Sequence, residues 1–343
     1  MHFKFKLGTD ISKGWLDFCM LNNKLDQLIQ QRIDNDCDSI QKFIDELIES
    51  NQIDSIDEIL LVAEHTGIYS NHLIRTWIAN GGQLCLVPAD KISEGLNGTS
   101  SFEEKTDPMD AHRIAEYACR FSDKLKLHSL CTFNLDSIKL LRSQRSRIVK
   151  VINILEVPVN EIKSFELKEH SDLVEKLQEV PIEALKTSLK NVEKEIKQII
   201  NQDSGLKELM RILCSVAGIG KVTACELIIT TNGFTDFAPN QAKSYARNCA
   251  VVPLPKSSGK YKRKGRISKK GNSKMKSLLT VCALSLINTN TDLGRYYKRK
   301  RESGKKHMSV LNAMRNKLIL RAFAVVRNNS MYKRNMNVSL VLP

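Results

Sequence analysis

Hydrophobic residues change their spacing along this chain, and this change limits the possible folds more than any other feature of the sequence. Up to about residue 90, apolar residues alternate with polar ones or form short solid blocks, as is typical of strands. Two helical patterns lie between these runs, and Gly81-Gly82 ends the second. The sequence predicts strands at 3–9, 15–21, 28–33, 59–63 and 84–87 and helices at 40–49 and 68–79. This order predicts an α/β domain with a mixed sheet.

The second half of the chain has a helical pattern. From residue 138 to about 209, apolar residues recur every three, four or seven positions, which is typical of long amphipathic helices. We expect an antiparallel pair, with Pro158 and Pro181 marking the breaks between its arms. Residues 211–326 then predict a compact, mostly α-helical unit, interrupted at 256–276 by a mobile loop of glycine and lysine.

Charge divides the chain at similar places. Residues 1–128 carry 13 basic and 21 acidic side chains, residues 129–210 carry 13 of each, and residues 211–343 carry 27 against 4. The net charges are −8, 0 and +23. Positive charge of this density repels itself unless phosphates neutralise it, so nucleic acid is the expected partner. We interpret the three segments as three domains with these boundaries.

Cysteine usage and hydropathy indicate a cytoplasmic protein. The 9 cysteines are scattered, without a C-x-x-C pair, which predicts reduced thiols rather than a zinc cluster or disulfides. The longest mostly apolar stretch, 278–287, is shorter than the roughly 18 residues that a bilayer span requires, and no charged-then-apolar leader is present. A protein with these features and a basic C-terminal third is expected at the nucleoid when it is bound to DNA.

Four acidic residues lie where predicted strands end and a predicted helix begins. Asp10 ends the first strand, Glu64 follows the block 59–63, and Asp107 and Asp110 open the next helix. Carboxylates gathered at one sheet edge need a hard cation such as Mg²⁺ between them. Two such ions roughly 4 Å apart would clamp the attacking and leaving oxygens of a phosphodiester.

Simpler explanations exist for each of these acids. Helix capping alone accounts equally well for Asp107 and Asp110, and a lone Asp10 or Glu64 is more typical of a turn. We interpret His65 as a neighbour of the acids rather than as a ligand.

Several short motifs occur in a characteristic order over nearly the whole chain. They are Gly8-Thr9-Asp10-Ile11-Ser12-Lys13, Ala63-Glu64-His65-Thr66-Gly67-Ile68-Tyr69, Lys105-Thr106-Asp107-Pro108-Met109-Asp110-Ala111, Ala217-Gly218-Ile219-Gly220, and Pro253-Leu254-Pro255-Lys256-Ser257-Ser258-Gly259-Lys260 leading to Gly265-Arg266-Ile267-Ser268. Together they resemble the DEDD-type insertion-sequence transposases of the IS110 class, also called bridge-RNA-guided recombinases.

The resemblance implies an architecture and a chemistry. It implies a RuvC-like, RNase H-type domain at 1–128, coiled-coil helices at 129–210, and a C-terminal transposase domain at 211–343. It also implies a metal-binding tetrad with Mg²⁺ as cofactor, a serine that attacks a DNA phosphodiester to form a covalent bond, and guidance by a structured noncoding RNA. Carried over by position, the tetrad is Asp10, Glu64, Asp107 and Asp110, and the nucleophile is Ser258. Ser257 stands where the family has a small or acidic residue, so Ser257 stays open as the alternative nucleophile.

Ser258 lies in a basic stretch that no acidic residue interrupts. A serine hydroxyl needs a base, a metal or strong positive potential to act as a nucleophile, and this stretch supplies the potential. From the residues alone, a phosphate-contacting hydroxyl or a linker residue is the commoner reading. The cations expected to contact nucleic acid here are Lys256, Lys260, Lys262, Arg263, Lys264, Arg266, Lys269 and Lys270.

Two further segments are candidate nucleic-acid contacts. Gly218-Ile219-Gly220-Lys221 resembles one turn of a helix-hairpin-helix, in which backbone N–H groups hold a phosphate. A tight turn between helices explains it equally well. Tyr296 and Tyr297, with Arg299 and other cations around them, suit stacking on unpaired bases, or form a solvated helix face.

Three functions remain open from the sequence. The leading one is an RNA-guided recombinase that cuts and rejoins DNA through Ser258. A RuvC-like junction nuclease that uses water would need only the four acids, and a non-catalytic nucleic-acid-binding relic would need neither. The apolar stripes of 138–209 also predict a homodimer or tetramer, in which Ser258 of one subunit can complete the acidic site of another.

Overall fold

A computed structural model describes residues 3–49, 53–64, 66–96, 107–128, 132–258, 261–268 and 271–333. The chain divides into two compact units, Met1–Leu130 and Cys131–Pro343. Each unit is considered separately below.

The first unit is built on a mixed sheet with the strand order β3-β2-β1-β4-β5. Strands β1 (Phe5–Ile11), β2 (Trp15–Asn22) and β3 (Gln27–Asp34) form an antiparallel meander, and β4 (Ile59–Glu64) and β5 (Gln83–Val87) add to β1 in parallel. The helices are α1 (Cys37–Glu49), α2 (Asn71–Ala79), α3 (Ala89–Leu96) and α4 (Asp107–Arg120), with short 3₁₀ turns at Ile56–Glu58, Gly67–Ser70 and Ser122–Lys124. The mixed sheet confirms the α/β prediction.

Both faces of this sheet are covered. In β4, Leu61 and Ala63 pack into a cluster with side chains of α1 and α2, whereas Leu60 and Val62 pack into a cluster with side chains of α3 and α4. Because successive residues of a strand point to opposite faces, a strand buried on both sides is apolar throughout. This explains the solid block 59–63 in the sequence.

Helix α4 lies unusually close to β1, and Gly8 permits this. A Cβ atom on Gly8 would lie 2.2 Å from the carbonyl oxygen of Ala111 and 2.3 Å from the backbone nitrogen of Ala115. Any larger residue at position 8 would push the helix away from the strand. The close approach brings the first turn of α4 towards the end of β1.

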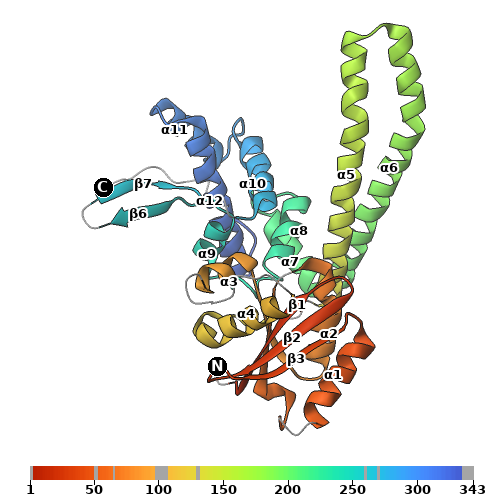
Figure 1. The fold of residues 1–343 in the computed structure, drawn as a ribbon. Coiled ribbons are helices and arrows are strands. Elements are labelled where there is room, and N and C mark those ends of the chain that lie inside the picture. Colours follow the sequence, from red (N-terminus) through yellow and green to blue (C-terminus); the bar gives the residue numbers. More distant parts are fainter. Residues whose placement is uncertain are drawn as a thin grey trace. The chain divides into compact units, whose positions relative to one another are not determined.

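The second unit begins with two long helices. Helices α5 (Phe133–Phe165) and α6 (Lys168–Gln202) run side by side as an antiparallel pair (Figure 1). The prediction of an antiparallel helical pair is therefore confirmed, but the predicted breaks are wrong. Pro158 lies inside α5 and Pro181 inside α6, both exposed, and the chain turns at Glu166–Leu167 instead. A proline in a helix interior loses one hydrogen bond, and here the packing of the paired helices outweighs that loss.

The rest of the unit is a helical bundle. It contains α7 (Ser204–Cys214), α8 (Lys221–Thr230), α9 (Ala242–Asn248), α10 (Ser273–Leu286), α11 (Asp292–Glu302) and α12 (His307–Arg327). These helices share one hydrophobic core with the base of α5 and α6, including Leu135, Ile138, Ile196 and Ile200. The helical pair is thus continuous with the bundle through buried side chains.

A two-stranded hairpin corrects the expectation of a mobile glycine-and-lysine loop. Strands β6 (Leu254–Ser258) and β7 (Tyr261–Arg266) pair antiparallel within the segment that was expected to be a loop. Dense charge and glycine suggested irregular chain, but the backbone of the two segments pairs across a short connection. Figure 1 shows this hairpin beside its labels β6 and β7.

Two expectations about the chain as a whole can be compared with the structure. The described cysteines, which exclude Cys131, are all free thiols. Of the helices in the described ranges, none combines the length and apolar character needed to cross a bilayer.

Candidate active site and cationic pocket

Asp10 and Glu64 are neighbours at one end of the sheet because of the register of two parallel strands. Thr9 of β1 is paired with Ala63 of β4, and Asp10 and Glu64 are the next residue on each strand. Helix α4 begins at Asp107 and carries Asp110 in its first turn. The four acids predicted from the sequence thus come from the ends of two adjacent strands and the start of the helix that packs on β1.

The other three carboxylates lie near enough to Asp10 for their repulsion to affect the pKa of Asp10. Partial burial is the main cause that raises the pKa of Asp10 from 3.8 to about 6, and repulsion from Asp110, Asp107 and Glu64 raises it further. Carboxylates that repel in this way favour either a proton or a bound cation. The donor set of four carboxylates suits a hard divalent ion.

Among the described residues, no group of three or more Asp, Glu, His or Cys side chains has the spacing of a metal site. This agrees with the raised pKa of Asp10, because charge repulsion acts over longer distances than metal coordination. His65 lies outside the described residues.

Asp107 is held by two donors that the sequence analysis did not identify. Its Oδ2 accepts hydrogen bonds from Arg32 Nη2 at 3.1 Å and from Trp15 Nε1 at 3.3 Å. Arg32 also donates to Asp17, from Nε to Oδ1 at 3.0 Å and from Nη2 to Oδ2 at 2.8 Å. Asp110 lies 3.9 Å from Arg113 Nη1. The signal for the Asp17–Arg32 pair was present in the sequence, because the two residues face each other across the predicted meander.

Ser258, the predicted nucleophile, is the last residue of β6. It is paired with Tyr261, Ser257 with Lys262, and Lys256 with Arg263. Of the other predicted contacts, Lys264 and Arg266 lie in β7, and Lys260, Lys269 and Lys270 lie outside the described residues. Ser258 belongs to the second unit and the four acids belong to the first.

The glycine turn before α8 has a packing role. Gly218 has a φ of +91°, and a Cβ atom there would lie 2.7 Å from Leu286 Cδ1. Gly220 is the N-cap of α8 and has open space around its Cα, and Lys221 is the first residue of the helix. The packing explains Gly218, whereas phosphate binding at Gly220 and Lys221 stays a prediction.

The predicted stacking tyrosines are engaged with neighbouring side chains. Tyr297 Oη lies 2.7 Å from His307 Nδ1, and the ring of Tyr296 lies below the cationic groups of Lys317 at 4.9 Å and Arg299 at 6.0 Å. Both rings are partly buried against the bundle core. Stacking of these rings on bases stays a prediction.

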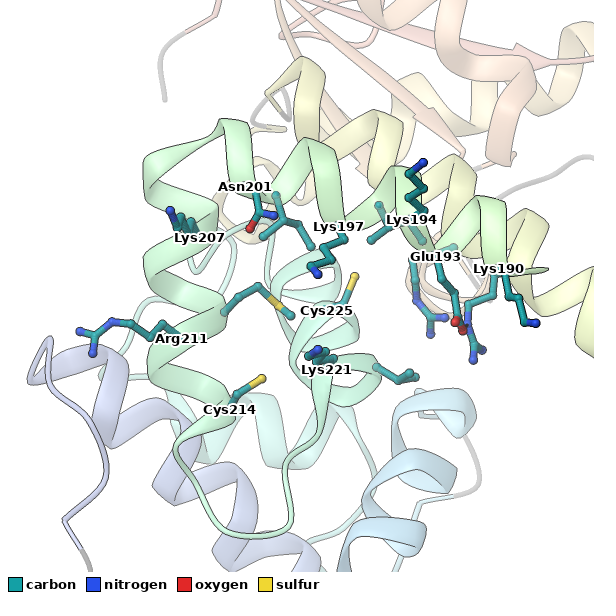
Figure 2. Close-up of a pocket in the computed structure, with 16 residues that line it drawn as sticks. Lys190, Glu193, Lys194, Lys197, Asn201, Lys207, Arg211, Cys214, Lys221 and Cys225 are labelled. Carbon is teal, nitrogen blue, oxygen red and sulfur yellow. Dashed lines mark hydrogen bonds and ion pairs between the residues drawn. The ribbon is translucent and has the colours of Figure 1, made fainter. Parts of the chain in front are cut away.

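A pocket of about 700 Å³ lies between α5, α6, α7 and α8, and its lining is strongly cationic (Figure 2). Its apolar floor is formed by Ile196, Ile200, Met210, Val222 and Cys225. The charged lining residues are Arg142, Arg145, Lys190, Lys194, Lys197, Lys207, Arg211, Lys221 and a single acid, Glu193. The sequence analysis missed this pocket because it counted segment 129–210 as neutral, and the cations of that segment are concentrated on one side only in the folded chain.

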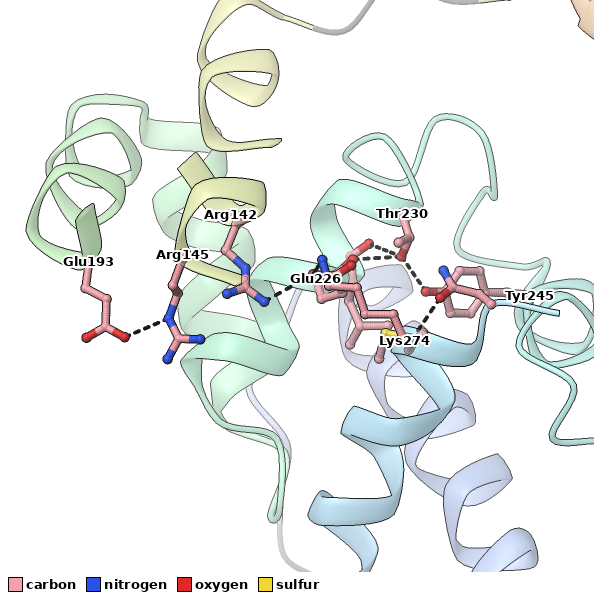
Figure 3. A network of polar contacts seen from close by, with 10 residues as sticks. Arg142, Arg145, Glu193, Glu226, Thr230, Tyr245 and Lys274 are labelled. Carbon is pink, nitrogen blue, oxygen red and sulfur yellow. Dashed lines mark hydrogen bonds and ion pairs between the residues drawn. The ribbon is translucent and has the colours of Figure 1, made fainter. Parts of the chain in front are cut away.

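A buried polar network joins the helical pair to the bundle next to this pocket (Figure 3). Glu226 of α8 accepts from Arg142 Nη2 of α5 at 3.2 Å and from Lys274 Nζ of α10 at 3.1 Å. Arg142 and Glu226 are 5% and 3% exposed. The network contains two cations and one anion, so it has a net positive charge beside the pocket.

Comparisons with known proteins agree with the sequence resemblance. A family model for the DEDD-type IS110 transposase matches residues 7–156, and the model described as "Transposase IS116/IS110/IS902 family" matches residues 210–298. The "Insertion element IS110 uncharacterized 43.6 kDa protein" of Streptomyces coelicolor is 27% identical over 167 residues, which are 48% of this chain and 41% of that protein. This chain therefore spans less than half of that relative.

Two other relatives match over most of their length. The "Pilin gene-inverting protein" of Moraxella lacunata is 23% identical over 97% of this chain and 99% of its own, and that of Moraxella bovis is 24% identical over 81% and 83%. Among solved structures, RuvC of T. thermophilus in complex with a Holliday junction substrate matches 36% of this chain and 99% of its own, with 9% identity. The TM-score of this match is 0.29, which is too low to relate the two folds. On the two family models and these relatives, the chain belongs to the IS110 family of insertion-sequence transposases.

Proposed function

We propose that this protein is a recombinase that cuts and rejoins DNA strands at the ends of an insertion sequence. The observation that carries the proposal is the placement of Asp10 and Glu64 at the ends of the paired strands β1 and β4, with Asp107 and Asp110 in the first turn of the helix that packs on β1. Burial and repulsion from the other three carboxylates raise the pKa of Asp10, which supports this placement. Maintaining four acids in mutual repulsion costs stability, and a site for divalent cations and phosphate repays that cost. The strand order β3-β2-β1-β4-β5 supports the RNase H-type assignment of this domain.

The four acids are proposed to hold Mg²⁺, with two ions in each site. When bound, the metal would polarise the scissile phosphate and stabilise charge on the attacking and leaving oxygens. A bound cation would stabilise the charged form of Asp10, which burial and the neighbouring negative charges disfavour by raising its pKa to about 6. Asp107 would have to exchange the Arg32 guanidinium for the cation, because both use the same carboxylate.

Ser258 is proposed as the nucleophile. Its hydroxyl would lose a proton and its oxygen would form a new ester bond to phosphorus, while the bond from phosphorus to a deoxyribose oxygen breaks and that oxygen takes up a proton. One phosphodiester is exchanged for another, so a hydroxyl from a second strand can reverse the step without any further energy source. The neighbouring cations of the hairpin would draw in the phosphate and stabilise its developing charge.

We also propose that a structured noncoding RNA selects the DNA. Support comes from the family resemblance and from the net charge of +23 on residues 211–343, which exceeds what one catalytic phosphate requires. When base pairing supplies the specificity, the protein needs only to bind backbone and shape.

Covalent capture of labelled DNA tests this mechanism. Wild-type protein should leave label attached to the chain on denaturing gels, Ser258→Ala should abolish the adduct, and Ser257→Ala should retain it. Asp10→Asn and Glu64→Gln should each lower cleavage by at least about a hundredfold while the proteins stay folded and bind nucleic acid.

Two results would contradict the proposal. Cleavage by Ser258→Ala that gives free DNA ends, with no adduct in the wild type, would establish a hydrolytic junction nuclease. Binding without cleavage by the wild type with its RNA, its DNA and Mg²⁺ would indicate a non-catalytic relic.

A further inference from the structure

The lining of the cationic pocket described above contains none of the residues that the proposed catalysis uses. Of its lysines, Lys190, Lys194, Lys197 and Lys207 belong to α6 and α7, and Lys221 begins α8. Within the part of the chain that the structure describes, none of these five has a carboxylate within ion-pair distance, although Arg145 of the lining is paired with Glu193 at 2.7 Å. Unneutralised positive charge around one cavity is costly for the free protein and favourable for an anionic ligand.

Arg142 provides a second, independent indication of a ligand. Its side chain is 6% exposed and lines the pocket, and one of its guanidinium nitrogens is bound by Glu226. Its Nε, in contrast, is buried and has no hydrogen-bond partner within the described residues. A buried donor without an acceptor destabilises the free protein, and an anion in the pocket would supply an acceptor.

The arrangement of the lysines fits a chain of phosphates rather than a single one. Lys190, Lys194 and Lys197 recur at intervals of four and three on one face of α6, as Figure 2 shows. At a rise of about 1.5 Å per residue, they extend over roughly 10 Å. A nucleic-acid strand carries one phosphate per nucleotide, so a row of three cations of this length suits successive phosphates of one strand better than a single phosphate.

The apolar floor indicates that the strand is unpaired. Ile196, Ile200 and Met210 line a cavity of about 700 Å³ with hydrocarbon and thioether surface. This volume is in the range of nucleotide-sized ligand sites, roughly 300–1,000 Å³, and a duplex would present only its outer backbone to such a cavity. An unpaired strand can direct a base or sugar onto the floor while its phosphates reach the lysines.

We propose that the cationic pocket between α5, α6, α7 and α8 binds an unpaired strand of nucleic acid, with phosphates on the lysines and Arg142 and a base or sugar on the apolar floor. The site goes beyond the proposed catalytic function, which gives no role to these helices. The proposal also assigns a nucleic-acid contact to residues 129–210, whose charges sum to zero.

Binding of labelled oligo(U) and oligo(dT) to the full-length chain, measured by fluorescence anisotropy over a range of salt without divalent metal, tests the proposal. Lys194→Gln with Lys197→Gln should weaken binding about tenfold at low salt and reduce the slope of log K against log salt by about 1.4, since each contact on a single strand contributes about 0.7. The matched control is Lys150→Gln with Lys176→Gln, which removes the same charge from exposed sites of α5 and α6 outside the pocket. Glu193→Gln should strengthen binding, because it removes the single acid of the lining.

The possible outcomes separate the explanations. Weaker binding by Lys194→Gln with Lys197→Gln, but not by the control variant, supports the site. Tighter binding of oligo(U) identifies the ligand as RNA, and tighter binding of oligo(dT) identifies it as DNA. Equal loss in the control variant, or equally strong competition by duplex or by inorganic phosphate, would overturn it. Because no metal is present and no cleavage is measured, failure of this site would leave the assignments of Ser258 and the four acids untouched.

Discussion

Arg32 Nη2 lies 3.1 Å from Asp107 Oδ2, so strand β3 is tied to the first turn of α4 by an ion pair at the candidate active site. The same guanidinium binds the carboxylate of Asp17, whose side chain is only 3% exposed. Arg32 therefore neutralises a buried acid and at the same time occupies one of the carboxylates proposed to bind metal. The Arg32 guanidinium and a metal ion would therefore compete for the carboxylate of Asp107.

Replacement of Arg32 by glutamine should have two opposite effects. Asp107 would no longer be shared, so half-maximal cleavage should need about two- to fivefold less Mg²⁺, as expected for the loss of one partly exposed ion pair. Asp17 would lose its partner, so the Tm should fall by about 2–4 °C. Cleavage measured against Mg²⁺ concentration and a thermal melt test both effects.

The control for this variant is a second substitution at the buried acid. Asp17→Asn combined with Arg32→Gln should recover most of the lost Tm while it keeps the lower Mg²⁺ requirement. An unchanged or higher Mg²⁺ requirement in Arg32→Gln would show that Asp107 does not exchange Arg32 for the metal.

Asp10 predicts an unusual dependence of stability on pH. Because the pKa of Asp10 is raised from 3.8 to about 6, the folded state binds a proton more tightly than the unfolded state. The carboxyl therefore costs no stability below about pH 4, costs progressively more as pH rises to about 6, and costs the full amount above that. Without divalent metal, Asp10→Asn should be more stable than the wild type above pH 6, and the difference should vanish towards pH 4.

Urea denaturation at several pH values, with and without Mg²⁺, measures this effect. At saturating Mg²⁺ the wild type should be more stable than Asp10→Asn, because it gains metal-binding free energy that the asparagine variant loses. Asp38→Asn, at an exposed site on α1 outside the acidic cluster, is a suitable control that should follow the wild type. A variant at position 10 that is less stable than the wild type at all pH values would show that Asp10 is not strained by its neighbours.

The buried network of Arg142, Glu226 and Lys274 predicts an asymmetry between its members. Glu226→Gln would leave two cations facing each other, one of them buried, and should cost about 3–5 kcal/mol of unfolding free energy. Arg142→Met would leave the neutral pair of Glu226 and Lys274 and should cost only about 1–2 kcal/mol. Urea unfolding of the two variants tests this, and a larger loss for Arg142→Met would contradict the charge argument.

Much of the first unit was predictable from its sequence, because its strands are either regularly alternating or buried on both faces. The block 59–63 and the run 15–21 both form strands as predicted. The Asp17–Arg32 contact was within reach of the same reasoning, since it follows from strand register. The close packing of Gly8 on Ala111 and Ala115 was not, because small residues carry no signal until the partner helix is known.

The second unit shows where local patterns fail. Pro158 and Pro181 predict helix ends when each segment is considered alone, but the partner helix stabilises both interruptions. The hairpin of β6 and β7 was missed because its sequence is dense in charge and glycine and has no alternating apolar pattern. The cationic pocket was missed for a third reason, since counts along a segment do not report on which side of a helix the charges lie.

The distal part of the helical pair predicts self-association. Ile154, Leu173, Leu177 and Val180 of α5 and α6 are 68%, 59%, 70% and 74% exposed in the single chain, and Phe165 at the turn is 88% exposed. Apolar surface concentrated along one projecting element is typical of an interface, and coiled-coil helices commonly bury it against a second copy. We expect a homodimer or tetramer through these helices. The double variant Leu177→Glu with Val180→Glu should convert it to monomers. The control Val281→Glu, at a site of α10 that is 65% exposed, should leave the assembly intact. Light scattering on the full-length proteins, with and without nucleic acid, gives the masses. A wild-type chain that stays monomeric under both conditions would mean that these side chains serve another partner, and Ser258 would then have to act within its own subunit.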